Sequence, residues 1–435
     1  MNPGLVIRLR PAGPWRIGPD SGARNKVDVV YHSDSLYSAV AGALARMGGL
    51  AEWLDATARA ATPAVCFSSC FPFLDDIHFV VPLRTMWPPT TPSLMSASVR
   101  WKSARFVPLS VVQTMLAGQP LDRNHWSVDG ASACLVPNGR PGPFRTGMRW
   151  GAAIDRLTGA SERHGTACIE FRAGAGLWTV VSFSDDAARD RWMEPVKAAF
   201  RLLADTGFGG ERSRGWGRSE APEFSEGTLP ELIVGAGGQA PGAGEPEPPV
   251  LEAAIEAVSP IPPLEPPAPE PPPPDPDPRP GPHPPVPEPE PGPSPIPPEP
   301  DPDPKLPEPG PVPPLPDPMP AFSAAPEEVV EPEAPAPSPW PAAPAFWLLS
   351  LFAPAPADTV DWARGNYVVL ARGGRVESPA GSGELKKQVR MIAEGSVVYA
   401  GAAPSGAAAD VAPDGFAHPV FRAGFALAIP LPEVR

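Results

Sequence analysis

The stretch that organises this sequence of 435 residues is a loop after a predicted helix, Gly207-Phe208-Gly209-Gly210-Glu211-Arg212-Ser213-Arg214-Gly215-Trp216-Gly217-Arg218. Its five glycines permit positive φ angles and close approach of the backbone to a ligand, and exposed N–H groups of such loops bind anions. Its arginines match phosphate geometry, and its two aromatic rings can stack on bases. The loop therefore predicts contact with single-stranded nucleic acid, with a tight solvated turn as the alternative.

Common motifs for cofactors and metals do not occur in the sequence. The glycine-rich loop matches neither the G-x-G-x-x-G dinucleotide pattern nor a P-loop that ends in G-K-[ST]. The four cysteines, Cys66, Cys70, Cys134 and Cys168, are spaced neither as a C-x-x-C pair nor as a disulfide framework. We therefore expect structural thiols, no metal site and no cofactor.

Composition divides the chain into three regions. Residues 239–345 hold about two-thirds of the 71 prolines, and 19 Asp and Glu against two basic residues. Such a segment cannot bury a core, so we predict a disordered linker, rich in polyproline II conformation, over 239–345. It separates predicted domains at 1–238 and 346–435. The linker therefore has a net charge of −17, and because the whole chain has −14, the two domains together have +3, which is compatible with RNA binding.

The N-terminal region predicts the element order strand, helix, strands, helix, strand. Alternating apolar residues indicate a first strand over 1–10, and apolar stripes indicate helices over 33–47 and 185–205. Two strands over 164–183 read as a pair with a glycine-rich connection. This β-α-β-β-α-β order is typical of a ferredoxin-like fold, which recurs in RNA-binding modules. The C-terminal region also predicts a mixture of helix and strand.

Several stretches resemble known families. His32-Ser33-Asp34-Ser35-Leu36-Tyr37-Ser38-Ala39, Ile154-Asp155-Arg156-Leu157-Thr158-Gly159 and the glycine-rich loop resemble the RAMP superfamily of CRISPR proteins. In the C-terminal region, Lys386-Lys387-Gln388-Val389-Arg390-Met391-Ile392-Ala393-Glu394-Gly395-Ser396-Val397 and His418-Pro419-Val420-Phe421-Arg422 resemble subunit four of the Csm complex, the type III-A effector. The long proline-rich insert departs from this family, in which the connection is short.

The resemblance implies an α+β protein with two ferredoxin-like (RRM-like) RAMP domains. It implies an RNA-binding subunit that holds the repeat-derived 5′ tag of the CRISPR RNA in antiviral defence. Its partners are expected to be the crRNA, the large polymerase-like subunit and the RAMP backbone subunits of the Csm complex. Cleavage is expected elsewhere in the assembly, so this chain is predicted not to be an enzyme.

The predicted RNA-binding residues lie in four places along the chain. They are His32 and Ser33 at a helix start; Arg145, Arg149 and Arg156 around a predicted turn; Gly207, Gly209, Gly210, Arg212, Ser213, Arg214, Gly215, Trp216 and Arg218 in the loop; and Lys386 and Lys387 in the C-terminal region. The two lysines may equally be read as contacts to a partner subunit or as a charged turn.

Two further hypotheses for function remain open. The first is a RAMP endoribonuclease that processes CRISPR RNA, with His32 near Asp34 as general acid and base. The second is a membrane-anchored transducer with a Pro-Glu-rich stalk. Because no signal peptide or membrane-spanning run opens the sequence, we expect a cytoplasmic protein without a membrane anchor.

Overall fold

The computed structural model describes residues 2–19, 22–89, 101–122, 124–156, 159–235, 343–378 and 381–432. All of these residues fall in one compact unit. The predicted linker over 239–345 lies outside the described residues except at its last three positions, so its disorder and the domain boundaries remain predictions. No helix among the described residues is both long and apolar enough to span a lipid bilayer.

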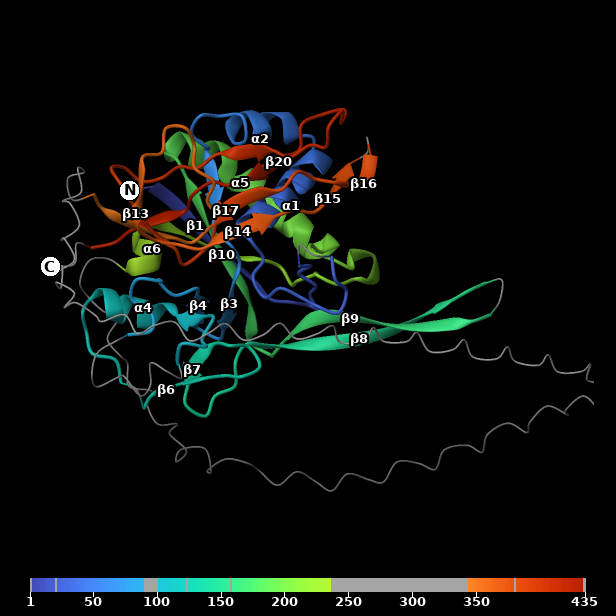
Figure 1. Cartoon of the computed structure of the whole chain (residues 1–435), viewed down its shortest axis with the longest axis horizontal. Helices are drawn as coiled ribbons and strands as arrows, with labels where there is room; N and C mark the ends of the chain where they lie inside the picture. The colour runs from blue at the N-terminus through green and yellow to red at the C-terminus, as the bar shows by residue number, and fades with distance from the viewer. Residues whose placement is uncertain are drawn as a thin grey trace, which may run out of the picture. The chain divides into compact units, whose positions relative to one another are not determined.

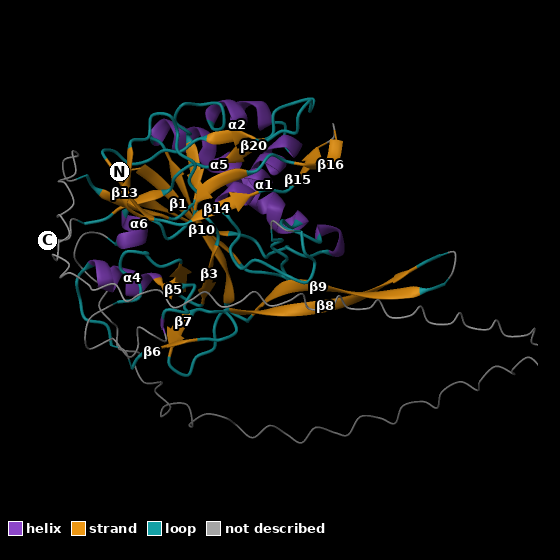
Figure 2. Cartoon of the chain, in the orientation of Figure 1, coloured by secondary structure: helices purple, strands orange, loops and turns teal. Residues whose placement is uncertain are grey.

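The N-terminal part is built on a seven-stranded antiparallel sheet, with helices packed against it (Figures 1 and 2). The strand order is β11-β1-β10-β3-β4-β5, and β2 also pairs with β10. The elements are β1 (Asn2–Leu9), α1 (Ser33–Arg46), α2 (Leu50–Ala56), β2 (Val65–Phe67), β3 (Phe71–Leu74), β4 (Ile77–Val80), β5 (Val107–Pro108), α4 (Leu109–Leu116), β6 (Trp126–Val128), β7 (Leu135–Pro137), β8 (Phe144–Ile154), β9 (Ser161–Phe171), β10 (Ala175–Phe183), α5 (Asp186–Thr206), β11 (Glu223–Leu229) and α6 (Glu231–Val234).

The predicted β-α-β-β-α-β order is present in this sheet. Strand β1 lies between β10 and β11, with α1 and α5 packed against each other and α5 against β1 and β10. The apolar alternation of β1 buries Leu5, Ile7 and Leu9 completely. Helix α5 begins where predicted, because the Asp185 carboxylate accepts a hydrogen bond from the backbone N–H of Ala188.

One predicted strand pairing is wrong. Strand β9 pairs with β8 over eleven residues on each strand and is not hydrogen-bonded to β10. The reason is that β10 is central in the sheet, with one edge on β1 and the other on β2 and β3. With both edges of β10 occupied, β9 and β8 form a separate two-stranded hairpin that extends away from the sheet (Figure 1).

The C-terminal part is built of strands alone within 343–378 and 381–432. A four-stranded sheet of order β13-β18-β12-β21 is joined by three two-stranded ribbons. Its elements are β12 (Ala345–Leu348), β13 (Val360–Asn366), β14 (Val369–Arg372), β15 (Arg375–Ser378), β16 (Gly381–Leu385), β17 (Val389–Ile392), β18 (Val397–Ala400), β19 (Ala408–Asp410), β20 (Phe421–Ala423) and β21 (Ala428–Pro430).

The chain as a whole has the expected α+β class, but its described C-terminal residues differ from the helix-and-strand mixture that the sequence predicted. Short stretches rich in β-branched residues, interrupted by glycine and proline, favour strands here, and this part packs on a helix of the N-terminal part. Helix α1 contacts β20, and the rings of Tyr37 and Phe425 meet edge to face at 5.5 Å. Trp347, Leu349 and Phe425 belong to the same buried cluster as the core of the N-terminal sheet.

Candidate nucleic-acid interface

His32 lies at the junction of the two parts and not on the surface. Its side chain is buried, with Nδ1 2.8 Å from Glu394 Oε1 and Nε2 3.4 Å from Asp28 Oδ2. Burial works against a charged imidazole, but the charge of Glu394 and the hydrogen bonds to Asp28 and Glu394 outweigh it and raise the pKa of His32 to about 10. His32 is therefore a buried imidazolium between two carboxylates.

The next two residues also bind the C-terminal part. Ser33 Oγ accepts a hydrogen bond from the N–H of Leu351, at 3.0 Å. Asp34 is fully buried and accepts hydrogen bonds from Arg372, at 3.1 Å, and from Arg422. Burial opposes the charge of Asp34, and the two guanidinium groups still hold its pKa below the usual range. Helix α1 has no side-chain cap at its start, because the side chains of Ser33 and Asp34 bind the C-terminal part instead.

The Glu394-Gly395-Ser396 stretch of the C-terminal part packs against the N-terminal part next to His32. The Ser69 hydroxyl donates to Glu394 Oε1, so the carboxylate joins two segments of the N-terminal part. Gly395 has φ 78°, and a Cβ there would lie 2.6 Å from Val81 Cγ1. A larger residue at this position would push the two parts away from each other. The placement of His32 and Ser33 in the RNA site is thus not supported, because both are enclosed in this contact.

The glycine-rich loop is folded tightly on itself. A Cβ at Gly217 would lie 2.1 Å from the carbonyl oxygen of Phe208, and one at Gly209 would lie 2.6 Å from that of Arg16. Glycine is required here for close backbone packing as well as for positive φ. Seven backbone N–H groups of the loop donate to carbonyl oxygens within the protein: those of Gly207, Phe208, Gly210, Arg214, Gly215, Trp216 and Gly217. Anion binding by this loop therefore falls to its side chains.

The aromatic residues of the loop belong to the core. Phe208 is 1% exposed and packs edge to face on Trp15 and Tyr31, with ring centroids 4.5 and 5.1 Å apart. Trp216 is 9% exposed. The prediction that these rings stack on bases fails, because each already has its faces covered by protein. The arginines and Ser213, by contrast, are exposed.

Arg16, which the sequence did not single out, fixes the segment that supports this loop. Its buried guanidinium donates to the carbonyl oxygens of Ala23, Arg24, Lys26 and Ala167 at 2.9 to 3.2 Å. Its own carbonyl oxygen accepts from the N–H of Gly210, at 2.8 Å. One residue thus connects the loop, through its backbone, with residues 23–26 and strand β9, through its side chain.

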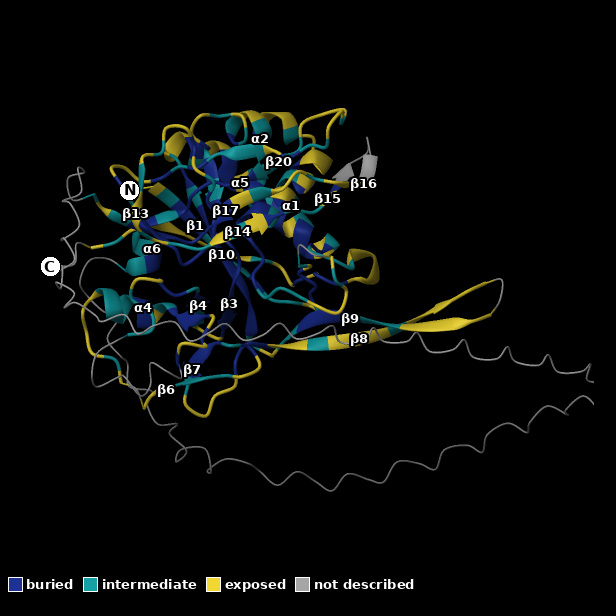
Figure 3. Ribbon diagram, viewed as in Figure 1, coloured by how far each residue is buried: buried dark blue, intermediate teal, exposed yellow. Residues whose placement is uncertain are grey.

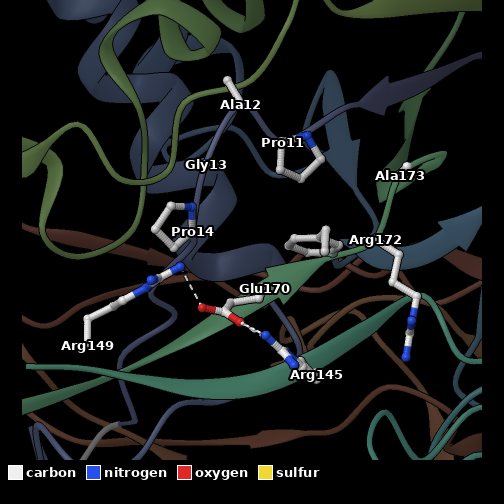
Figure 4. Close-up of a pocket in the computed structure, with 10 residues that line it drawn as sticks. Pro11, Ala12, Gly13, Pro14, Arg145, Arg149, Glu170, Arg172 and Ala173 are labelled. Carbon is white, nitrogen blue, oxygen red and sulfur yellow. Dashed lines mark hydrogen bonds and ion pairs between the residues drawn. The ribbon is translucent and has the colours of Figure 1, made fainter.

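The β8–β9 hairpin carries a second group of predicted residues, and most of its outer length is exposed (Figure 3). Arg145 and Arg149 lie on β8 and flank Glu170 of β9, with N–O distances of 2.9 and 2.6 Å (Figure 4). They line a pocket of about 550 Å³ whose opposite wall is formed by residues 11–14. The N–H of Gly217 donates to the carbonyl oxygen of Pro14, so this pocket adjoins the glycine-rich loop.

The remaining predicted residues do not all join this cluster. Arg218 is exposed, and its Nε donates to the carbonyl oxygen of Asp205 at 2.6 Å. Arg156 is exposed near the tip of the hairpin, on the order of 20 Å along the strand from Arg149. Lys386 and Lys387 follow β16 in the C-terminal part, and Lys387 pairs with Asp414 at 2.8 Å. The structure thus places the glycine-rich loop next to the base of the hairpin, and it leaves the two lysines on a different part.

We searched the described residues for sets of metal ligands and for reactive cysteines. No group of three His, Cys, Asp or Glu side chains within them is arranged to hold a metal ion. Cys70, Cys134 and Cys168 are buried and Cys66 is half-buried, and all four are free thiols. Burial raises the pKa of Cys66 and of Cys134 to about 12, which disfavours the reactive thiolate.

Comparison with known proteins identifies the C-terminal part. Residues 342–431 match the family model described as the CRISPR Csm4 C-terminal domain. This part of the chain belongs to the Csm4 family. The match confirms the resemblance to subunit four of the Csm complex, and the Csm4 domain contains Arg372, Glu394 and Arg422, which bind the N-terminal part.

Solved structures are similar to the chain over nearly its whole length. A chain in the crystal structure of the Csm3-Csm4 subcomplex in the type III-A CRISPR-Cas interference complex has 11% identity and a TM-score of 0.50, with 98% of this chain and 99% of that chain covered. A chain in the crystal structure of the Csm1-Csm4 cassette in complex with cA4 has 14% identity and a TM-score of 0.47, with 100% and 99% covered. The first of these shares the fold described above. No curated protein sequence matches the chain.

Proposed function

We propose that this chain is the subunit of a type III-A CRISPR effector complex that holds the 5′ tag of the CRISPR RNA. The observation that carries the proposal is the set of exposed arginines on two neighbouring elements, the glycine-rich loop and the base of the β8–β9 hairpin. Arg212 and Arg214 come from the loop, and Arg145 and Arg149 from the hairpin. Guanidinium groups in this number suit the phosphates of a single strand.

The hairpin also offers the exposed aromatic surface that the loop lacks. Trp150 on β8 is 60% exposed, and the guanidinium of Arg163 on β9 lies 4.3 Å from the centroid of its ring. An exposed indole beside a cation provides a stacking platform for an unpaired base. Trp150 therefore takes the role that the sequence suggested for Trp216.

We propose further that the chain is not a nuclease. A general acid or base must lie within hydrogen-bond reach of the group whose proton it moves. The His32 ring is 5% exposed, and both of its nitrogens face carboxylates of the chain itself. An RNA 2′-hydroxyl has no route to it while the two parts remain in contact. This geometry favours the binding function over the endoribonuclease alternative.

The proposed partners follow from the family and from the solved complex whose chain shares this fold. The Csm3-Csm4 subcomplex pairs a Csm4 with Csm3, and we extend this pairing to the present chain and a RAMP backbone subunit. Docking of the large polymerase-like subunit rests on the family resemblance of the C-terminal part. We place this assembly and its RNA in the cytoplasm.

Binding of fluorescent RNA that carries the repeat-derived tag, measured by anisotropy over a salt series, tests the proposal. Arg212→Ala with Arg214→Ala, and separately Arg145→Ala with Arg149→Ala, should weaken binding. Each lost phosphate contact should also lower the slope of log K against log salt by about 0.7, the value for single strands. The matched control is Arg189→Ala, because Arg189 pairs with Asp186 at the far end of α5 from the loop.

Two results would count against the proposal. Equal affinity and equal salt slope in both double variants and in the control would remove these arginines from the RNA site. Cleavage of the RNA by the pure protein, abolished in His32→Ala but retained in His418→Ala, would support the endoribonuclease instead.

A further inference from the structure

The pocket between the base of the β8–β9 hairpin and residues 11–14 has a carboxylate between two guanidinium groups (Figure 4). Glu170 of β9 lies directly across from Arg145 of β8. Its Oε2 accepts a hydrogen bond from Arg145 at 2.9 Å, and its Oε1 lies 2.6 Å from Nη2 of Arg149. The hairpin side of the pocket thus presents a donor, two adjacent acceptors and a second donor in a row.

Gly147 makes room for this row. It lies between Arg145 and Arg149 on the same face of β8, because alternate residues of a strand share a face. A Cβ at Gly147 would lie 3.0 Å from Cδ of Glu170 and 3.2 and 3.3 Å from its two carboxylate oxygens. The carboxylate therefore lies over a position that carries no side chain.

The charged groups of the row remain accessible to a ligand. The side chains of Arg145, Arg149 and Glu170 are 69%, 57% and 20% exposed. Because a guanidinium has five N–H donors, both arginines keep donors beyond those that Glu170 uses. The negative charge between them repels a phosphate and favours a neutral group that both donates and accepts hydrogen bonds. An unpaired nucleobase is such a group.

We propose that this pocket reads an unpaired guanine base, an inference that rests on the proposed RNA-binding function and names a base that the RNA presents there. The edge of guanine carries in order the acceptor O6, the donors N1–H and N2 amino, and the acceptor N3. This order complements the row formed by Arg149, Glu170 and Arg145. Adenine, cytosine and uracil each lack two adjacent donors. Arginine is also the side chain that most often contacts O6 of guanine.

The rest of the pocket gives the base a surface to lie against. Pro11 and Pro14 line the wall that faces the hairpin, and Arg172 also lines the pocket (Figure 4). The plane of an arginine guanidinium stacks on unpaired bases. The pocket volume of about 550 Å³ also lies within the range of small-ligand sites, roughly 300–1,000 Å³.

The test compares three fluorescent uridine decamers that carry one guanine, inosine or adenine at the centre. Inosine keeps O6 and N1–H of guanine but lacks the N2 amino group. Measured by anisotropy, the unaltered chain should bind the guanine decamer about tenfold more tightly than either of the others, the effect of one well-placed base contact. The tag RNA serves as the reference for RNA binding as such.

Two variants separate base reading from a structural role of the ion pairs. Glu170→Gln should abolish the preference for guanine and should strengthen binding of the adenine decamer, because a charge that repels phosphates is removed. A structural defect would instead weaken all three decamers alike. Gly147→Val keeps every charge but displaces the carboxylate, so it should also abolish the preference.

Glu162→Gln is the matched control. Glu162 is exposed on β9, eight residues before Glu170 and on the same face, opposite Ala153 near the tip of the hairpin. The substitution removes the same charge outside the pocket. The preference for guanine should therefore remain at its full size in this variant.

Each other outcome overturns the inference. Equal or undetectable binding of the three decamers, while the tag RNA still binds, would exclude guanine reading and leave the proposed function standing. Failure of the tag RNA itself to bind would overturn both. A full preference in Glu170→Gln would show that guanine is read elsewhere. Displacement of the guanine decamer by an equal concentration of guanosine monophosphate would assign the pocket to a free nucleotide and not to RNA.

Discussion

His32 and Asp34 connect the two parts of the protein through buried charge. The imidazolium lies between Glu394 and Asp28, and Asp34 lies between Arg372 and Arg422. Removing one member of such a set leaves a charge buried without its partner, which is strongly destabilising. The short His-Ser-Asp motif therefore acts as a structural clamp, and the proposed RNA site uses other residues.

The pKa of His32 leads to a prediction about stability at alkaline pH. The folded-state pKa, about 10, lies above the unfolded value near 6.5, so the extra stability is fully present below pH 6.5 and is lost as the pH rises through about 10. The melting temperature should therefore fall between pH 7 and pH 10. In His32→Asn it should start lower and fall less over the same range, as measured by thermal unfolding monitored by circular dichroism.

His418→Asn provides the control for this experiment, because His418 is exposed, whereas His32 is buried. Its pH profile should match that of the unaltered chain. If His32→Asn retained the full alkaline decline, the imidazolium would not be the group that the clamp depends on.

At the scale of the element, the glycine-rich loop is a rigid support whose glycines have unequal roles. Gly215 and Gly217 both have φ 78°. A Cβ at Gly215 meets nothing within 4 Å, whereas one at Gly217 would overlap the carbonyl oxygen of Phe208. The two positions therefore separate backbone strain from steric overlap within one loop.

We predict that Gly215→Ala lowers the free energy of unfolding by about 1 kcal/mol, the cost of a left-handed conformation. Gly217→Ala should cost about 3 kcal/mol, because Phe208 must also move. Urea denaturation measures both. RNA affinity should fall more in Gly217→Ala than in Gly215→Ala, since only the former displaces the loop. Equal losses of stability would show that the overlap at Gly217 is relieved without cost.

The sequence predicted the elements with strong local periodicity and missed the contacts made at long range. Strand β1 and helix α5 follow from apolar spacing within a few residues. The pairing of β9 with β8 depends on the occupied edges of β10, which local patterns do not reveal. The exposed arginines of the loop were predictable from composition, but the burial of Trp216 was not, because it depends on tertiary packing.

The same limit explains why the sequence placed His32 in the RNA site. A histidine at a helix start looks like an RNA-binding or catalytic group until Glu394, 362 positions away, is known to lie 2.8 Å from it. The sequence did draw attention to the stretch that contains the partner of His32, because Glu-Gly-Ser-Val resembled the Csm family. What the sequence could not supply was the pairing of that stretch with the His-Ser-Asp motif.

At the scale of the whole molecule, two sequence regions separated by more than a hundred residues form one folded unit with one shared core. The contacts that join them lie within this unit, so they do not depend on the intervening insert. Exposed arginines are carried on the N-terminal part, beside the pocket at the base of the hairpin.

The central claim is that this protein holds the 5′ tag of CRISPR RNA, and the RNA that copurifies with it tests this most directly. The chain should be expressed from its own operon, crosslinked to RNA, purified, and the bound RNA sequenced. We predict small RNAs that share one repeat-derived 5′ sequence, with crosslinks at that sequence. Absence of bound RNA, or unrelated RNAs with no common 5′ end, would contradict the account.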